Sequence, residues 1–493
     1  MLQLSSGIDR YWVLLTYTLM AAMQGMTWAV PGSILNTYTS PAVYNVSVDT
    51  AQLFLNYGPI FYLLCAFPVM WHMDRYGIRG TVWSGILLVA SSNVIRCFAN
   101  DSSTRSVIFL HLSFILNASA GPAAMAVPSK LAEDWFPPSE RTLATAVAAL
   151  GNQSGTLILS LAIAAVWPNP TKHDNLCLNI FLAALSLLNV AAALVYFPSH
   201  PPVPPSASAS ISKEGEAGIT VASLGRSVGV VFCNRSFVVV LLAYSASTGL
   251  LNCVNALLPQ ALGNLGEQNP QGTAGWVGFI TNFSSMLCGI VLASIIDRYK
   301  GVFSGVQKYV LVVCMAMCGI SFLAFATILS GALPALPSST ALYVVSGLYI
   351  LSGTGQGVAI PIMFEICAEQ TGVSISAGEG AEENELDEVA RERGPSQLLL
   401  QTPSQTALTR EPVPTGTMLS VLTVMSNLVS FVTLWAPNGS FFLWANWAGA
   451  GVFLASSIFF ACFLPATLPR FYFDKLYENQ LQAPRKTDNL SYY

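Results

Sequence analysis

Stretches of about twenty apolar residues recur along this chain, and they constrain its fold more than any other feature. The hydrocarbon core of a bilayer is about 30 Å thick, so a helix needs roughly 20 apolar residues to cross it. Only 9% of the 493 residues are charged, whereas a soluble globular protein has about 25%. We therefore expect an all-α membrane protein. The apolar windows predict twelve transmembrane helices, over 11–35, 52–71, 80–98, 106–130, 142–167, 176–197, 236–261, 273–296, 309–331, 338–365, 415–436 and 441–464.

The basic residues are distributed unevenly between the two sets of loops that these helices define. With a cytosolic N-terminus, 18 of the 21 lysines and arginines fall on the cytosolic side, and only Arg96, Arg105 and Lys172 fall on the other side. Cytosolic loops of membrane proteins carry such an excess. We therefore expect a multi-pass protein with both termini in the cytosol. The sequence leaves open whether the membrane is lysosomal or vacuolar, or the plasma membrane.

Two polar segments organise the chain. Residues 198–235 begin with "PSHPPVPPSASAS", a composition typical of an extended linker. This cytosolic linker is expected to separate an N-terminal six-helix half, 1–197, from a C-terminal half, 236–465. The acidic segment at about 367–414 is interpreted as a disordered cytosolic insertion between the tenth and eleventh helices. Residues 466–493 are expected to form a cytosolic tail.

The two predicted halves carry the same short motif at matching places. Asp74-Arg75-Tyr76 follows the second predicted helix, and Asp297-Arg298-Tyr299 follows the eighth. Two parallel six-helix repeats are the architecture of major facilitator transporters, so the chain resembles that superfamily. We interpret the charged residues here as a cytosolic gate that forms in one conformation and breaks in the other; the alternative is charge that only orients the protein in the membrane. The gate residues are Asp74, Arg75, Arg79, Asp297 and Arg298.

Longer stretches narrow the resemblance to one family. "GPIFYLLCAFPVMWHMDRYGIRGTVWSGILLVASSNVIRCF" and "KLAEDWFPPSERTLATAVAALGNQSG" resemble the solute carrier 49 family. "YFPSHPPVPPS", "PIMFE" and "FDKLYENQ" are similar to its lysosomal branch, whereas "GNQSG" is closer to its virus-receptor-related branch. The resemblance implies a facilitator of small organic solutes. It associates the receptor-related branch with choline, ethanolamine and haem, and the lysosomal branch with proton-driven movement of a vitamin B6 form.

Polar side chains inside the predicted helices are candidates for a substrate pocket, because polar groups in a bilayer are costly. Gln24 and Trp28 are one turn apart and share a face of the first helix. Asn152 lies in the fifth helix. By similarity to the receptor-related branch, Gln153 and Tyr244 are the expected ligand contacts. The alternative is hydrogen bonding between helices, often worth about 0.6 kcal/mol per bond.

The pocket is expected to be neutral with aromatic walls. No lysine or arginine falls in the middle of a predicted helix. A strongly anionic substrate would therefore lack a counter-charge, and a neutral solute or a cation held by aromatic faces fits better. Glu365 is the carboxylate embedded in a predicted helix, and we interpret it as a proton-coupling residue, or else as a charge at the cytosolic end of its helix. His111 is a second proton-coupling candidate, or else an interfacial residue.

The sequence therefore predicts a secondary transporter that works by alternating access, with proton coupling as a hypothesis. The expected substrate is a small neutral or cationic organic solute, similar to pyridoxine, choline or ethanolamine. The alternatives are a non-transporting receptor or sensor on a transporter fold, and a protein similar to a haem exporter. No phosphate-binding loop of the GxxxxGK[ST] type occurs. We expect no enzymatic activity, catalytic residue, cofactor, metal site or nucleic-acid partner, and a monomer in the lipid bilayer.

Overall fold

The computed structural model of the chain is all-helical over the residues that it describes. These are 8–166, 171–206, 231–268, 270–299, 306–331, 338–371, 415–435 and 439–464, together with Ala209, Gly225, Val228 and Gly229. No strand occurs among them. The predicted tail, most of the predicted insertion and much of the predicted linker lie outside the described residues. Helix α16 runs to Thr371, so it includes the first residues of the segment that we expected to be the insertion.

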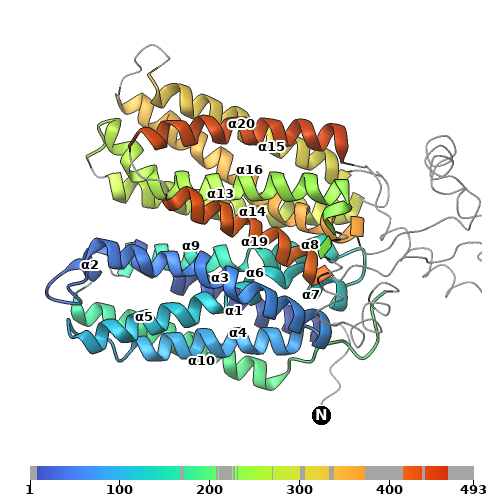
Figure 1. The fold of residues 1–493 in the computed structure, drawn as a ribbon, viewed down its shortest axis with the longest axis horizontal. Coiled ribbons are helices and arrows are strands. Elements are labelled where there is room, and N and C mark those ends of the chain that lie inside the picture. The colour runs from blue at the N-terminus through green and yellow to red at the C-terminus, as the bar shows by residue number, and fades with distance from the viewer. Residues whose placement is uncertain are drawn as a thin grey trace, which may run out of the picture.

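The first half of the chain forms one group of helices, which lies in the lower part of Figure 1. Its elements are α1 (Ile8–Ser33), α2 (Leu35–Thr39), α3 (Val48–Tyr76), α4 (Ile78–Arg96), α5 (Thr104–Ser119), α6 (Gly121–Ala126), α7 (Pro128–Trp135), α8 (Arg141–Ala149), α9 (Gly151–Val166) and α10 (Lys172–Val195).

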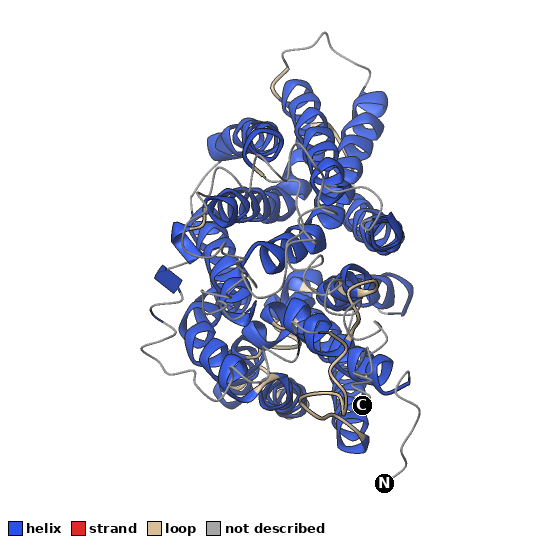
Figure 2. Ribbon diagram, turned by 90° about the vertical axis from the view of Figure 1, so that its right-hand side faces the viewer, coloured by secondary structure: helices blue, strands red, loops and turns tan. Residues whose placement is uncertain are grey.

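The second half forms another group, in the upper part of Figure 1, and Figure 2 shows many of the helices of both groups nearly end-on. Its elements are α13 (Arg235–Asn264), α14 (Pro270–Tyr299), α15 (Val306–Leu329), α16 (Ser338–Thr371), α19 (Thr415–Trp435) and α20 (Gly439–Phe463). Helix α19 runs obliquely between the two groups toward α7 and α8 (Figure 1).

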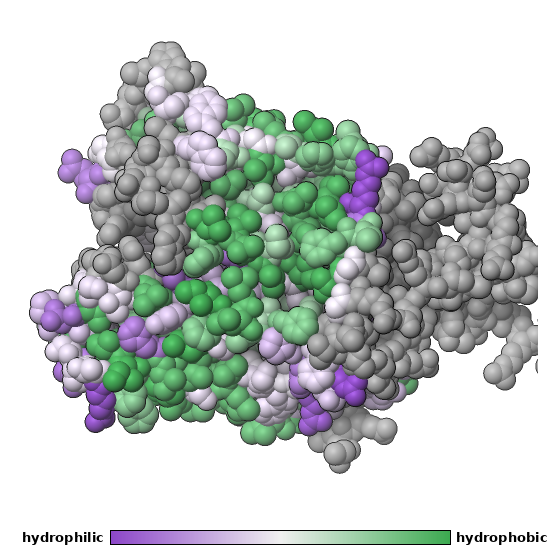
Figure 3. All heavy atoms as spheres, viewed as in Figure 1, coloured by the Kyte–Doolittle hydropathy of each residue, from purple (hydrophilic) through white to green (hydrophobic). Residues whose placement is uncertain are grey.

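Each apolar window coincides with helix, the fourth being covered by α5 to α7 and the fifth by α8 and α9. Within the described part of the chain, nine helices are long and apolar enough to cross a membrane, and Thr417–Val432 is a shorter apolar helix. Figure 3 shows a largely apolar middle with hydrophilic residues near both ends. The all-helical membrane fold is therefore confirmed, and the count of twelve crossings stays a prediction.

Helices α1 and α9 cross at a distance that only glycine permits. A Cβ atom on Gly155 would overlap the backbone carbonyl of Ala22, and one on Gly25 would overlap the carbonyl of Asn152. Small residues allow such backbone approach between membrane helices. The crossing places the polar side chain of Gln24 directly beside that of Asn152.

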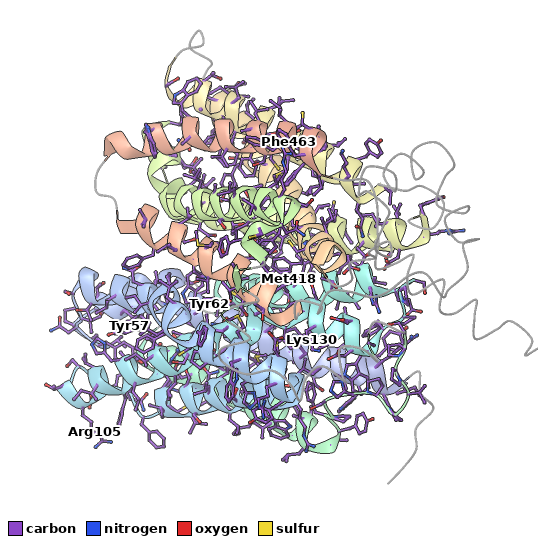
Figure 4. All side chains as sticks on the ribbon, turned by 45° about the vertical axis from the view of Figure 1, so that its right-hand side comes forward. Tyr57, Tyr62, Arg105, Lys130, Met418 and Phe463 are labelled. Atoms are coloured by element: carbon purple, nitrogen blue, oxygen red, sulfur yellow. The ribbon has the colours of Figure 1, made fainter. Side chains whose placement is uncertain are left out.

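An apolar core joins the two halves near one end of the bundle. It includes Met73 and Val127 from the first half together with Met418 and Leu419 from the second. This end also carries Asp74 and Asp297, near the ends of α3 and α14, and we call it the Asp74 end. Figure 4 places Met418 where the two halves meet. A second apolar cluster, which includes Tyr38, lies entirely within the first half.

Candidate functional site

A chain of amide groups connects three helices of the first half. The Oε1 atom of Gln24 accepts from Nδ2 of Asn152 at 2.5 Å, and Nε2 of Gln24 donates to the carbonyl of Asn117 at 3.4 Å. Asn117 returns a hydrogen bond from Nδ2 to the carbonyl of Gln24 at 3.2 Å. Gln24 is 6% exposed. The predicted pair Gln24 and Asn152 is thus in contact, and both amides are largely occupied by neighbours in the protein.

Gln153 and Trp28 form fewer hydrogen bonds with the rest of the protein than Gln24 and Asn152 do. Gln153 is partly buried, and its Oε1 atom has no hydrogen-bond partner in the described structure. The indole of Trp28 donates from Nε1 to the carbonyl of Leu55 at 3.1 Å, and the residue is 37% exposed. A buried amide oxygen without a partner is costly, so Gln153 has an acceptor to offer to a ligand.

Two tyrosines from opposite halves lie beside α19. The hydroxyl of Tyr62, in α3, donates to Thr423 at 2.5 Å across the boundary between the halves. Tyr244, in α13, is 2% exposed, forms a hydrogen bond with Ser426, and its ring lies 5.4 Å from that of Phe364. Figure 4 places Tyr62 at this boundary. Tyr244 was predicted from sequence, whereas Tyr62 was missed because a tyrosine within an apolar window gives no signal of its partner.

The second half has its own amide contact, which sequence reasoning also missed. Gln356 in α16 donates from Nε2 to Ser247 at 3.0 Å and to Thr248 at 3.1 Å. Its Oε1 atom is buried without a hydrogen-bond partner in the described structure. Ser247 precedes Asp297 by 50 residues, and Gln24 precedes Asp74 by 50 residues. Aligning the two halves on the repeated motif therefore pairs Ser247 with Gln24, so the sequence did contain a signal for this position.

At the Asp74 end, each aspartate of the repeated motif contacts the first turn of a helix in the opposite half. Oδ2 of Asp74, which is 1% exposed, accepts from Oγ1 of Thr417 in α19 at 2.5 Å. The carboxylate of Asp297 accepts from the backbone N–H groups of Thr142 and Leu143 in α8, at 3.3 and 2.7 Å. Negative charge is stabilised at a helix N-terminus, where backbone N–H groups lack partners within the helix.

The arginines of the motif lie nearer the surface than the aspartates. Arg79 and Arg298 are exposed, and Arg75 is partly exposed with its guanidinium 5.5 Å from the ring of Tyr76. Among the described residues, two other cations at this end are buried: Lys130, which lies 3.3 Å from Asp134, and Arg141, the first residue of α8. Both aspartates of the motif thus contact the opposite half, and the gate role of the three arginines stays a prediction.

The two proton-coupling candidates occupy different surroundings. Glu365 is 2% exposed, and its Oε2 atom accepts from Thr145 of α8 at 3.3 Å, which makes another contact between the halves. His111 is partly exposed in α5, and its Nδ1 atom lies 2.8 Å from the hydroxyl of Tyr57 in α3. Glu365 therefore lies at the boundary between halves, and His111 lies within the first half.

Comparison with known proteins supports the same architecture. The family model of the Major Facilitator Superfamily matches residues 13–377. The proton:xylose symporter XylE bound to 6-bromo-6-deoxy-D-glucose has a similar fold, with a TM-score of 0.62 at 13% identity over 95% of this chain and 99% of that one. At that identity the likeness shows the fold alone.

Two sequence relatives narrow the family. The solute carrier family 49 member 4 homolog of Xenopus tropicalis is 30% identical over 95% of this chain and 92% of that protein. The choline/ethanolamine transporter FLVCR1 of Felis catus is 28% identical over 59% of this chain and 52% of that protein. The resemblance that we drew from the sequence motifs is therefore confirmed. The chain belongs to the solute carrier 49 family of the major facilitator superfamily and is a membrane transporter rather than an enzyme.

Proposed function

We propose that this transporter carries a small neutral or cationic organic solute by alternating access of the two halves. The observation that carries the proposal is the chemistry of a set of polar side chains that lie in the helices, between the two ends of the bundle. They are amides, hydroxyls and aromatic rings, and the set contains no charged side chain. Its members are Gln24, Asn117, Asn152, Gln153, Tyr62, Tyr244, Ser247, Thr248, Gln356, Thr423 and Ser426.

The unpartnered atoms of this set favour a substrate that donates hydrogen bonds. Gln153 and Gln356 each have a buried Oε1 atom without a partner in the described structure. An ammonium or hydroxyl group of the solute would satisfy these acceptors, and leaving them unsatisfied costs about 1–3 kcal/mol each. The faces of Tyr62 and Tyr244 would attract a cation. Choline, ethanolamine and pyridoxine have this chemistry, and the name of the related feline transporter supports the first two.

The contacts at the Asp74 end support a conformation that is closed there. Opening that end would break the hydrogen bonds of Asp74, Asp297 and Glu365 to the opposite half, and then the bond from Tyr62 to Thr423. Hydrogen bonds to charged groups contribute about 1.5–3 kcal/mol each. A few such bonds can hold one conformation and still exchange with another. With the predicted cytosolic orientation, this state would receive substrate from the non-cytosolic side.

Glu365 is our candidate for proton coupling. Its carboxylate contacts Thr145 in the closed state, so its surroundings must change when α8 and α16 separate. A buried carboxylate near a moving boundary can take up a proton in one conformation and release it in the other. His111 is the second candidate, although its partner Tyr57 belongs to the same half and the contact need not change.

The proposal is tested by uptake of radiolabelled choline, ethanolamine and pyridoxine into cells that express the chain, at two external pH values. We expect saturable uptake of at least one of them above vector-transfected cells, and stimulation by acid on the donor side of the membrane if protons are coupled. Saturable binding without uptake would favour the receptor alternative. Transport of haem without transport of any amine or pyridoxine would favour the haem-exporter alternative.

A further inference from the structure

Arg96 is fully buried within the first half, at the end of α4 (Ile78–Arg96) opposite the Asp74 end. It is the last residue of α4 and has 0% exposure. Its Nε atom donates to Ser113 in α5 at 3.3 Å, and its guanidinium carbon lies 4.4 Å from the centre of the Phe114 ring. Both terminal nitrogens, Nη1 and Nη2, are buried without a hydrogen-bond partner in the described structure. Most of the donors of this cation are therefore unused.

No carboxylate compensates this charge among the described residues. The groups that interact electrostatically with Arg96 are Tyr38, Tyr44 and Cys97. The acid nearest in sequence is Asp101, which is exposed and accepts hydrogen bonds from Ser103 and from Ser106. A guanidinium stays protonated in proteins, and burying an uncompensated charge is very costly. An anion bound at this site would therefore compensate the buried charge.

A neutral donor, the hydroxyl of Tyr38, interacts electrostatically with the guanidinium, and both residues pack near the ring of Phe114. The hydroxyl of Tyr38 is buried and has no hydrogen-bond partner in the described structure. Burial raises the pKa of Tyr38 far above its usual value, so the hydroxyl keeps its proton. The hydroxyl of Tyr44 is already used, because it donates to the carbonyl of Ala99 at 2.8 Å. Among the described residues, Tyr38 is thus a donor without an acceptor, and it interacts with a cation that has no anion.

We propose that a chloride ion binds between Arg96 and Tyr38, held by Nη1 and Nη2 of the guanidinium and by the Tyr38 hydroxyl. The surrounding rings favour a small ion. Phe54 stacks on Phe114 with 4.8 Å between ring centres, and the ring of Tyr38 lies 6.0 Å from that of Phe54. Sulfate and phosphate are larger and need more donors than these three groups supply. A monatomic halide matches both the enclosure and the number of donors.

The proposed ion is structural rather than transported. Tyr38 belongs to α2, Arg96 to α4 and Phe114 to α5, and all three helices lie in the first half. The site therefore needs no contact that alternating access would break. The ion would tie the short helix α2 to α4 and α5, independently of which solute the transporter carries. Chloride should stabilise the protein without being moved by it.

The test uses the purified full-length protein in detergent. Chloride replaces gluconate at constant ionic strength, and two quantities are measured: the binding of radiolabelled chloride and the thermal unfolding midpoint. We expect one saturable site per chain and a midpoint that rises with the logarithm of the chloride concentration once the site is loaded. Bromide should substitute for chloride, and sulfate should not. An unfolding midpoint and radiolabel binding that do not depend on chloride would overturn the proposal.

Three variants locate the site. Arg96→Gln should abolish both the bound radiolabel and the chloride dependence of the midpoint. Tyr38→Phe removes a hydroxyl that has no hydrogen-bond partner among the described residues, so it should fold normally and weaken chloride binding several-fold. This variant keeps the test decisive if Arg96→Gln fails to fold. Arg105→Gln is the control, because Arg105 is an exposed arginine in α5 that projects from the edge of the bundle in Figure 4. Chloride binding by Arg96→Gln or Tyr38→Phe that equals the wild type would contradict the assignment.

Discussion

At the scale of single residues, Asp74 and Asp297 have equivalent roles on opposite halves. Asp74 accepts from a side chain in the first turn of α19, and Asp297 accepts from the backbone in the first turn of α8. The acceptors belong to the repeated motif, whereas the donors lie in α8 and α19, outside the motif. We propose that these two contacts act as latches that close the Asp74 end, with the substrate contacts elsewhere.

Replacing Asp74 by asparagine should slow transport and leave substrate binding nearly unchanged. The substitution replaces the carboxyl group that accepts from Thr417 by an amide, and losing about 1.5 kcal/mol would shift the equilibrium between closed and open states about tenfold. The measurement is the maximal transport rate together with the dissociation constant of the substrate. Thr417→Val should reproduce the effect, and Asp101→Asn, an exposed acid at the other end, serves as the control. Loss of binding at an unaltered rate would rule out the latch role.

Replacing Glu365 by glutamine should abolish acceleration by a pH gradient while preserving exchange of substrate for substrate. The amide mimics the protonated carboxyl and cannot release a proton, so the cycle would no longer be biased by proton concentration. Glu140→Gln is the matched control, because Glu140 pairs with Arg10 at 3.1 Å within the first half. Equal pH stimulation of wild type and Glu365→Gln would leave His111 or uncoupled transport as the explanations.

At the scale of helices, the apolar windows predicted where helices lie but not where they break or which side chains meet. The fourth window is divided near Pro122 and Pro128, which lie in the first turns of α6 and α7. Proline favours the start of a helix, so this signal was present in the sequence. The bond between Asp74 and Thr417 joins residues 343 positions apart. No local pattern specifies such a pairing, because it depends on how the two halves pack.

The crossing of α1 and α9 makes a separate prediction. Gly155→Ala should destabilise the protein by roughly 1–3 kcal/mol, because the added methyl group would overlap the backbone carbonyl of Ala22 and force the helices apart. Gly278→Ala in α14 is the control, since a Cβ atom there meets no atom within 4 Å. The unfolding midpoint in detergent distinguishes the two. Equal midpoints for both variants would mean that the crossing tolerates separation.

At the scale of the whole molecule, the two halves resemble each other not only in the repeated motif but also in a polar contact between helices. Gln24 bonds to a residue of the fourth span in the first half, and Ser247 bonds to Gln356 of the tenth span in the second. The sequence allowed the two halves, the family and the positions of Gln153 and Tyr244 to be proposed. It did not reveal Tyr62, Thr423 or Gln356 as members of the same polar set, because their roles depend on contacts between helices.

The excess of basic residues predicts that both termini lie in the cytosol. Epitope tags placed before residue 1 and after residue 493 should be probed with antibody on intact cells, after selective permeabilisation of the plasma membrane, and after permeabilisation of organelle membranes as well. Access to both tags after plasma-membrane permeabilisation alone is the expected result. A tag that is accessible on intact cells, or only after the organelle membrane is opened, would reverse or break the predicted topology.

The most direct test of the account is substrate exchange by the purified protein in proteoliposomes preloaded with unlabelled choline, ethanolamine or pyridoxine. We predict saturable entry of the labelled solute that is accelerated by the unlabelled one inside. Gln153→Ala should raise the half-saturation concentration about tenfold, as expected for losing one hydrogen bond of about 1.4 kcal/mol. Tyr244→Leu should also raise it, because the aromatic face that attracts the cation is lost. Tyr349→Leu, at a buried tyrosine that packs against Phe325 outside the polar set, should leave it as in the wild type. Binding of these solutes without exchange, or exchange that is unchanged in both pocket variants, would contradict the account.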